Sequence, residues 1–327
     1  MNFQKIPEIK NYEYYTDIAF REARKEFEQK TFRAKSKESI AKKRAEIKIT
    51  AVNTRLCKDL VKILRDFPHV EDLNEFYYEL FSCYFSIDEY KKDLSNVNWL
   101  VKKVKQFSNI YAKKAKSAKD PKEIDTFVGS YYGRISSMFK QVKSSFEHLE
   151  LYRKSLREMP AIKPHCLNVV LYGFPNVGKS TLLSKLTTAK PEISNYEFTT
   201  KKINMGYRKK GGVTLQIFDT PGTLNRFEKM NAIEKQAFLV LKHLADVIIF
   251  VFDAGRDFDE QKQLFDSVSK EMIIYCSKVD LHPQSEILSK VTCLTTLEGL
   301  EASFIPYIQK KELELLELKK SGEFEFV

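Results

Sequence analysis

The first half of the sequence has almost no glycine. Of the 11 glycines in 327 residues, only Gly129 and Gly133 precede Pro160. Glycine is needed where a backbone turns tightly or approaches a ligand closely, so this half lacks the frequent turns of an α/β or all-β domain. The second half has them. The contrast predicts two architectures, and the length fits about two domains.

Cysteine is scarce, and long apolar runs are absent. The five cysteines are Cys57, Cys83, Cys166, Cys276 and Cys293. None forms a C-x-x-C pair, which argues against a zinc knuckle and favours reduced thiols. No stretch reaches about 18 consecutive apolar residues, so no membrane-spanning helix is predicted. The N-terminal residues also lack a signal-peptide pattern. We therefore expect a cytoplasmic protein with no membrane partner.

Positive charge is concentrated in the first half. The chain has 55 Lys+Arg and 44 Asp+Glu, a formal net charge of +11. Residues 1–160 hold 33 and 23 of these, a net of +10, whereas residues 161–327 hold 22 and 21. Arg21–Lys48 has 11 Lys/Arg and 5 acids, and Lys91–Lys119 has 9 Lys and one Asp. Each run fits either a solvated helix face or a phosphate-binding surface for nucleic acid. Charge alone does not separate RNA from DNA or from an acidic protein.

The first half also has the periodicity of amphipathic helices. Thr16–Ile49 has no Pro or Gly and is rich in helix formers, so we expect a helix there. Further helices are predicted from Ala51 to a point before Pro68, and over Leu73–Cys83, Asp88–Ala118 and Ile124–Glu158. Their apolar residues recur at three- and four-residue steps. An example is the stripe Val52, Leu56, Leu60, Ile63 and Leu64. Residues 1–160 are therefore predicted to form a basic, antiparallel helical bundle.

A phosphate-binding loop begins the second half. The strand-forming run Leu167–Tyr172 precedes it, and a helical segment beginning with Thr181 follows. The loop residues are Gly173, Phe174, Pro175, Asn176, Val177, Gly178, Lys179 and Ser180. This is G-x-x-x-x-G-K-[ST] in its strand-loop-helix context. The backbone N–H groups and the helix N-terminus would bind the β-phosphate. Lys179 would reach the β- and γ-phosphates, and the Ser180 hydroxyl would bind Mg²⁺.

Downstream residues have the order of a nucleotide switch. Thr200 can complete the Mg²⁺ shell when a γ-phosphate is present. Two strands, Lys201–Tyr207 and Val213–Phe218, are predicted to form a hairpin around Gly211-Gly212. The second strand leads into Asp219, Thr220, Pro221 and Gly222. Asp219 would hold Mg²⁺ through water, and the Gly222 N–H would meet the γ-phosphate. The catalytic roles are assigned to Lys179, Thr200 and Gly222.

Two further apolar strands, Val247–Phe252 and Met272–Cys276, precede the base-binding residues. The second is followed by Ser277, Lys278, Val279 and Asp280. The Asp280 carboxylate can accept the two N–H groups of the guanine N1/N2 edge, which adenine lacks, and this selects GTP over ATP. Ser277 stands where Asn is expected, so a contact to the base or a brace to the phosphate loop can be lost. Thr295 and Thr296 are candidates for the loop under the base, with a structural turn as the alternative.

These residues resemble the nucleolar GTP-binding protein 1 family of Obg-related GTPases. The motifs that carry the resemblance are GFPNVGKST, NYEFTTKKINMGY, DTPGTLNR followed by MNAIEKQA and, in the first half, DFPHVEDLNEFYYELFSCYFSIDEYKKDL. The last is the most diagnostic, because general GTPase motifs do not extend there. The resemblance covers about residues 1–300. It implies an all-α helical bundle (residues 1–160) followed by a P-loop GTPase domain with a doubly wound, mostly parallel sheet (residues 161–310). A short C-terminal helix and tail (residues 311–327) complete the expected compact, archaeal-like form.

The resemblance also implies a function. The family binds GTP/GDP with Mg²⁺ and acts in large ribosomal subunit assembly, so rRNA and the subunit precursor are expected partners of a monomeric GTPase. Asn176 lies where related GTPases bind an activating K⁺, although it can equally brace the loop. Thr223 stands where many GTPases have a catalytic Gln, which predicts slow intrinsic hydrolysis. Two alternatives stay open: a non-catalytic rRNA-binding scaffold with a structural nucleotide, and a translation-associated GTPase on mature ribosomes.

Overall fold

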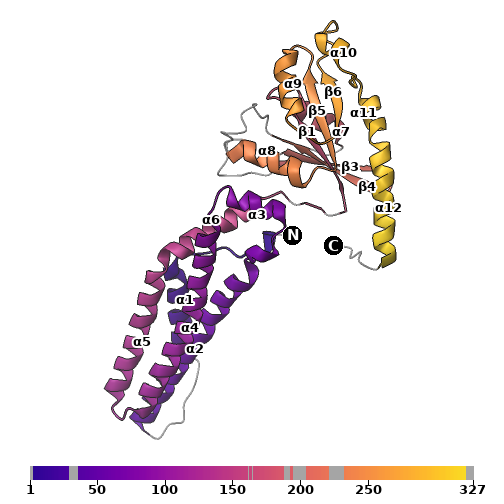
Figure 1. Cartoon of the computed structure of the whole chain (residues 1–327). Coiled ribbons are helices and arrows are strands. Elements are labelled where there is room, and N and C mark those ends of the chain that lie inside the picture. The colour runs from indigo at the N-terminus through magenta and orange to yellow at the C-terminus, as the bar shows by residue number, and fades with distance from the viewer. Residues whose placement is uncertain are drawn as a thin grey trace. The chain divides into compact units, whose positions relative to one another are not determined.

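The chain forms two units, each with its own contacts (Figure 1). The computed structural model describes residues 3–28, 36–160, 162–163, 165–187, 192–193, 204–220 and 232–321. The helical unit consists of Asn2–Leu73 and Phe85–Arg157, and the α/β unit consists of Asn74–Tyr84 and Glu158–Val327. The predicted fold class, an all-α region before an α/β region with a mostly parallel sheet, is confirmed. Among the helices that the structure describes, none has both the length and the apolar content needed to cross a lipid bilayer.

Five long helices make up the helical unit. They are α1 (Tyr12–Glu28), α2 (Lys37–Asp66), α4 (Ile87–Ser117), α5 (Pro121–Gln141) and α6 (Lys143–Glu158), with 3₁₀ turns at Phe3–Lys5 and Val70–Asp72. Side-chain caps begin three of these helices. Ser36, Ser86 and Asp120 accept the backbone N–H groups of Ser39, Glu89 and Lys122. Such caps satisfy N–H groups that the helix itself leaves unpaired.

Two helix predictions for this unit are wrong in their continuity. The helix expected over Thr16–Ile49 is two helices, because Ser36 has an extended backbone (φ −146°, ψ 155°) and starts α2 as its N-cap. The helix expected over Ile124–Glu158 is divided at Val142, whose φ of −108° and ψ of 22° are not helical. In both places helix propensity is high on either side, and the local backbone decides the break.

The predicted apolar stripes form the core of the helical unit. Val52, Leu56 and Leu60 of α2 are 0% exposed, as are Leu100 and Val104 of α4. The helices α2, α4 and α5 pack against one another along these stripes. Each fully buried Leu or Val side chain contributes about 1.5–3 kcal/mol relative to an exposed one, so the stripes hold the unit together.

A six-stranded sheet is the centre of the α/β unit. Its strands are β1 (Leu167–Tyr172), β2 (Glu192–Ile193), β3 (Asn204–Lys210), β4 (Val213–Asp219), β5 (Val247–Asp253) and β6 (Met272–Ser277), in the order β2-β3-β4-β1-β5-β6. The pairs β4–β1, β1–β5 and β5–β6 are parallel. The predicted hairpin is confirmed: β3 and β4 are antiparallel around Gly211-Gly212. Parallel strands bring the carboxyl ends of β1, β4, β5 and β6 to one edge.

Helices complete the α/β unit. They are α3 (Glu75–Ser82), α7 (Lys179–Leu186), α8 (Ala232–His243), α9 (Phe258–Asp266), α10 (Glu286–Lys290), α11 (Leu297–Ser303) and α12 (Ile305–Ser321). Helix α7 contacts β1, β3 and β4, and α12 contacts β1 and β4. Figure 1 shows α12 as the long yellow helix that passes β3 and β4.

Helix α3 comes from the first half of the sequence and packs in the α/β unit. It contacts α8, where Glu79 Oε1 lies 2.7 Å from Lys242 Nζ. The buried Tyr77 hydroxyl donates to the Pro160 carbonyl at 2.8 Å and accepts the Ile162 N–H at 3.1 Å. The chain therefore enters the α/β unit at Asn74, leaves it after Tyr84 and returns at Glu158. The domain boundary expected near Pro160 lies close to this last crossing. The expected division did not place α3 in the second unit.

Candidate nucleotide-binding site

The phosphate loop connects β1, a central strand, to α7. Gly173 has φ +145°, and a Cβ there would lie 2.7 Å from the Val251 carbonyl oxygen. Gly178, directly before α7, has φ +96°. A side chain is disfavoured at both positions, by the close backbone approach at the first and by the left-handed conformation at both. The two glycines of the motif are therefore required by the shape of the loop.

Lys179 lies inside this loop. Its side chain is buried (5% exposed), and Nζ donates to the carbonyl oxygens of Gly173 at 3.0 Å and Phe174 at 2.6 Å. A buried ammonium is stable only with several acceptors around it. The loop thus holds the positive charge of Lys179 at the first turn of α7, where the helix N-terminus adds its own partial positive charge.

Two of the three residues predicted to bind Mg²⁺, Ser180 and Asp219, lie in contact. Ser180 Oγ donates to Asp219 Oδ2 at 2.5 Å, although the two residues are 39 positions apart in the sequence. Asn204, which pairs with Asp219 across β3 and β4, donates Nδ2 to the same oxygen at 3.3 Å. Hydroxyl and carboxylate oxygens are the ligands that Mg²⁺ prefers, so this pair fits the ion. Thr220 instead donates Oγ1 to the Leu171 carbonyl at 2.8 Å, which ties β4 to β1.

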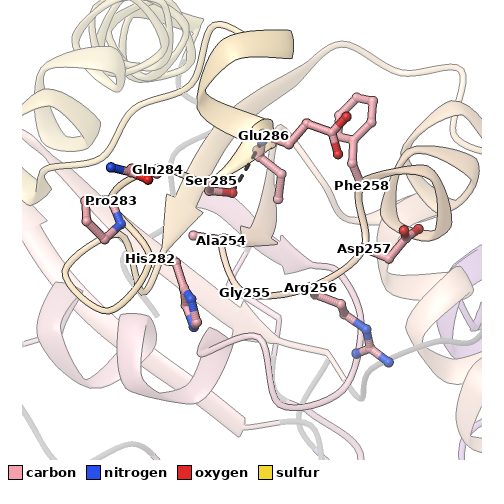
Figure 2. A pocket seen from close by; sticks show the side chains of 11 residues that line it. Ala254, Gly255, Arg256, Asp257, Phe258, His282, Pro283, Gln284, Ser285 and Glu286 are labelled. Carbon is pink, nitrogen blue, oxygen red and sulfur yellow. Dashed lines mark hydrogen bonds between the residues drawn. The ribbon is translucent and has the colours of Figure 1, made fainter.

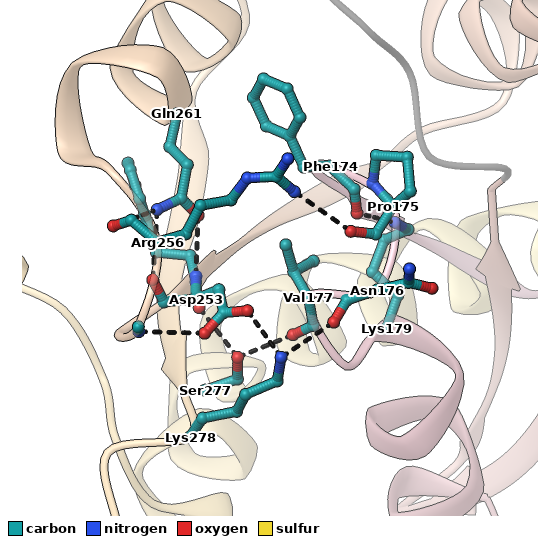
Figure 3. A network of polar contacts seen from close by, with 12 residues as sticks. Phe174, Pro175, Asn176, Val177, Lys179, Asp253, Arg256, Gln261, Ser277 and Lys278 are labelled. Atoms are coloured by element: carbon teal, nitrogen blue, oxygen red, sulfur yellow. Dashed lines mark hydrogen bonds and ion pairs between the residues drawn. The ribbon is translucent and has the colours of Figure 1, made fainter. Parts of the chain in front are cut away.

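Side chains donate to five consecutive carbonyl groups of the phosphate loop, from Gly173 to Val177 (Figure 3). Lys179 accounts for the first two, and donors from other segments account for the rest. These are Arg256 Nη1 to Pro175 (3.3 Å), Lys278 Nζ to Asn176 (3.0 Å) and Ser277 Oγ to Val177 (2.7 Å). Holding the carbonyl side leaves the loop N–H groups for an anion, which is how backbone phosphate sites work.

Ser277 does contact the phosphate loop, although the sequence suggested that this contact could be lost. Its Oγ lies 2.7 Å from the Val177 carbonyl and 3.0 Å from that of Phe252. The expectation that a shorter residue than Asn loses the brace to the phosphate loop is therefore wrong. The Ser277 side chain is short, but the two loops lie close together. A Cβ at Gly178 would be only 3.7 Å from Ser277 Oγ. The close packing of the two loops compensates for the missing length.

A pocket of about 420 Å³ opens beside these loops. It is lined by residues from the phosphate-loop side, from the end of β6 and from the segment before α11, among them Gly178, Thr181, Ser277, Lys278, Asp280 and Thr295. The structure thus gathers six of the predicted nucleotide residues around one opening. Thr296 has a different place: its side chain accepts the Gly299 N–H at 3.2 Å and caps α11. Of the two alternatives for Thr296, a loop under the base or a structural turn, the contacts of its side chain fit the structural turn.

A second pocket, of about 480 Å³, lies between the β5–α9 loop and the segment before α10 (Figure 2). Arg256, Asp257, His282 and Ser285 are among its lining residues. The His282 ring lies so close to Gly255 that a Cβ there would be 2.4 Å from Nε2. Its described lining contains none of the predicted nucleotide residues, but Arg256 joins it to the phosphate loop.

Sequence reasoning missed three polar residues of this region: Asn204, Asp253 and Arg256. Asp253 Oδ2 lies 2.6 Å from Lys278 Nζ, and the Arg256 guanidinium lies 4.6 Å from the centre of the Phe174 ring. One signal was present, because Asp253 ends an entirely apolar strand at the carboxyl edge of the sheet.

Some predicted residues lie outside the described part of the chain. These are Thr200, Pro221 and Gly222. Thr223, on which the slow-hydrolysis expectation rests, also lies there. Their assigned roles stay predictions.

Comparisons with known proteins match the two halves of the chain to two families. Residues 3–163 match the family described as the NOG1 N-terminal helical domain, and residues 168–278 match that of a 50S ribosome-binding GTPase. An uncharacterized protein of Methanocaldococcus jannaschii is 34% identical over 251 residues, which cover 74% of this chain and 70% of that protein. The FeoB G domain of T. maritima is 26% identical, with a TM-score of 0.37, over 44% of this chain and 99% of that domain.

Two eukaryotic relatives are named nucleolar GTP-binding protein 1. The Caenorhabditis elegans protein is 32% identical over 276 residues, covering 81% of this chain and 40% of that protein. The Arabidopsis thaliana protein is 31% identical over 250 residues, covering 73% and 37%. The match thus spans less than half the length of these relatives. Both predicted parts, a helical domain and a GTPase domain, are confirmed in their predicted order. The chain belongs to the nucleolar GTP-binding protein 1 family.

Proposed function

We propose that the chain is a GTP-hydrolysing switch in large ribosomal subunit assembly, and that it binds rRNA through α4. The observation that carries the proposal is a basic face of α4 whose lysines have no carboxylate partner among the described residues. The pocket lined by the predicted guanine-nucleotide residues supports it. The names of the matched families and relatives support the ribosomal setting. The nucleotide would control affinity for the particle.

The nucleotide roles follow from the site. Lys179 would neutralise charge on the β- and γ-phosphates, and Asp280 would select guanine. Ser180 directly and Asp219 through water would hold Mg²⁺, which would neutralise charge that develops on the phosphates during transfer. Thr200 and Gly222 would meet the γ-phosphate side when GTP is bound, and hydrolysis would release them. With Thr223 next to Gly222, we expect slow intrinsic hydrolysis. Equal single-turnover rates in K⁺ and Na⁺ would exclude an activating K⁺ at Asn176.

The RNA-binding role is assigned to one face of α4. Between Leu94 and Lys119 the sequence has seven lysines and no acid. Four of them, Lys102, Lys105, Lys113 and Lys116, are exposed and recur at helical spacing on one side; we call them the α4 stripe. At 1.5 Å per residue the stripe extends about 21 Å along the helix. No carboxylate among the described residues lies within 4.0 Å of these lysines.

The other basic run of the sequence is arranged differently. On α2, Lys42 lies 2.7 Å from Glu38, Lys43 lies 2.7 Å from Glu46, and Arg44 lies 4.0 Å from Asp125. Carboxylates therefore neutralise part of this run within the protein itself. A cation that already has an anionic partner gains less from a phosphate, because that partner must be displaced or left unpaired. The α4 stripe is the better RNA-binding surface for this reason.

A matched pair of variants tests the assignment. The variants K102Q/K105Q and K42Q/K43Q each remove two lysines from one helix, and among the described residues the second pair alone has carboxylate partners. We expect K102Q/K105Q to weaken binding to large-subunit rRNA and to lower the slope of log K against log salt by about 1.4–1.8. K42Q/K43Q should change the slope much less. Equal effects of the two variants would contradict the assignment to α4.

Lys179→Ala separates a switch from a scaffold. A switch that cannot bind nucleotide should stay on, or fail to join, an immature large subunit, so gradient fractions should contain a trapped assembly intermediate. A scaffold predicts normal association and normal subunit profiles. Association only with mature ribosomes would point instead to a translation-associated GTPase.

A further inference from the structure

The loop between β5 and α9 contains a carboxylate that none of these nucleotide roles uses. Asp253 ends β5, pairs with Ser277 across β5 and β6, and is 8% exposed. Its Oδ2 lies 2.6 Å from Lys278 Nζ, and its Oδ1 accepts the Gly255 N–H at 3.0 Å. A buried carboxylate needs such partners, so the ion pair restrains both side chains.

A buried side chain also holds the backbone of Asp253 in place. Gln261 of α9 is 0% exposed, and its Oε1 accepts the Asp253 N–H at 2.8 Å. Its Nε2 lies 3.2 Å from the Asp253 carbonyl oxygen (Figure 3). A side-chain amide that binds both backbone groups of one residue fixes that residue's position. The position of Asp253 is therefore fixed by the fold. It does not depend on where the Lys278 side chain lies.

Lys278 needs an anchor because its backbone is strained. Lys278 (φ +58°) and Asn176 (φ +63°) are the two described residues other than glycine with positive φ. Lys278 Nζ donates to the Asn176 carbonyl at 3.0 Å, so the two strained residues are joined directly. Such conformations cost about 1–3 kcal/mol each and persist only where the surroundings enforce them. The Asp253 carboxylate is one of the groups that enforce them here.

We propose that Asp253 is a positioning residue for guanine recognition: it holds Lys278 against the phosphate loop and thereby sets the place of Asp280 in the base pocket. The proposal rests on the guanine-nucleotide binding proposed above. Lys278 and Asp280 line the same pocket and are two residues apart, so a displaced Lys278 moves the carboxylate that reads the base. Asp253 acts only through Lys278.

Asp253→Asn tests this in the full-length chain, with Asp266→Asn as the matched control. Asp266 also pairs with a lysine at 2.7 Å, but this pair lies exposed on α9, away from the pocket. The ligands are GDP and IDP, which lacks the exocyclic amine that Asp280 reads. We expect D253N to weaken GDP binding about tenfold, the cost of one charge-assisted hydrogen bond. The GDP/IDP affinity ratio should fall at least about threefold, and D266N should change neither quantity.

The ratio distinguishes positioning from general damage. A loosened phosphate loop would lower GDP and IDP affinity by the same factor, and this result would overturn the proposal. So would D253N behaving like D266N. In a Lys278→Gln background, adding D253N should cause no further loss, because the effect passes through Lys278. Asp253→Ser, which is smaller, repeats the test should D253N fold poorly. If the unmodified chain itself bound IDP as tightly as GDP, the proposed guanine recognition would fail, whatever the variants show.

Discussion

Two groups of cations on this chain are used in opposite ways. In the α/β unit, Lys179, Arg256 and Lys278 donate to backbone carbonyls of one loop, and Lys179 is only 5% exposed. On α4, the four lysines of the α4 stripe are exposed and have no carboxylate partner among the described residues. The half of the sequence with a net charge of +1 thus contains cations that one loop holds in place. The half with +10 contains, on α4, a row of lysines that no described carboxylate holds.

The difference shows that local partners, rather than net charge, decide what a lysine does. A cation held by several acceptors in a fixed geometry can recognise one phosphate group at one position. A row of free cations instead attracts any phosphate backbone, and its attraction falls as salt rises. Substitutions in the two groups should therefore differ in size, in salt dependence and in the ligand that they affect.

The largest effect is expected from Lys179→Ala. Two charge-assisted hydrogen bonds to phosphate, at about 1.5–3 kcal/mol each, correspond to a loss of about 100-fold or more in GTP and GDP affinity. Titration with a fluorescent guanine nucleotide measures this loss. Lys262→Ala is the control, because Lys262 pairs with Asp266 on the surface of α9 and contacts no part of the loop. A decrease of only a few-fold for K179A would remove the contrast between the two groups.

A smaller effect is expected from Ser277→Ala. The change removes the neutral brace from Oγ to the Val177 carbonyl, which contributes about 0.5–1.5 kcal/mol. GDP affinity should therefore fall about two- to tenfold, in high salt as in low salt. The measurement is the dissociation constant at two salt concentrations. A loss that disappears in high salt would show that the brace acts through charge and not through geometry.

The smallest effect is expected from a single lysine of the α4 stripe. Lys113→Gln should leave nucleotide affinity unchanged and lower the slope of log K against log salt for rRNA by about 0.7–0.9. Its measurement is a set of RNA titrations over a range of salt. If this one change abolished RNA binding, the stripe would contain a specific contact, and the comparison with Lys179 would fail.

Much of the fold was predictable from local pattern. The strands β1, β4, β5 and β6 were expected within a residue or two of their ends, because short apolar runs between polar or turn-forming residues are typical of buried strands. The continuity of the helices was not predictable in the same way. Ser36 starts α2 through one side-chain hydrogen bond, in a region that is rich in helix formers and has no Pro or Gly.

The candidate site was predictable where its residues follow a motif. Lys179, Ser180 and Asp219 meet as the spacing of their motifs implies. Arg256 could not be found this way, because its partner Pro175 lies 81 residues earlier in the chain. The position of Asp253 at the end of an apolar strand was a local signal, but its pairing with Lys278, 25 residues later, was not predictable. Only the parallel sheet brings the ends of β1, β5 and β6 together, and no local pattern shows which residues it will pair.

Helix α3 has a consequence for the newborn chain. Its buried side chains Phe76, Tyr77, Leu80 and Phe81 are synthesised long before α8, the helix that α3 contacts. At typical translation rates the roughly 150 residues between α3 and α8 take about 8–30 s. The helical unit can close during this interval, whereas α3 lacks its contacts with α8 until α8 has been made. The residues of α3 that pack against α8 are therefore exposed on the nascent chain for this time, and a chaperone that binds apolar segments could cover them.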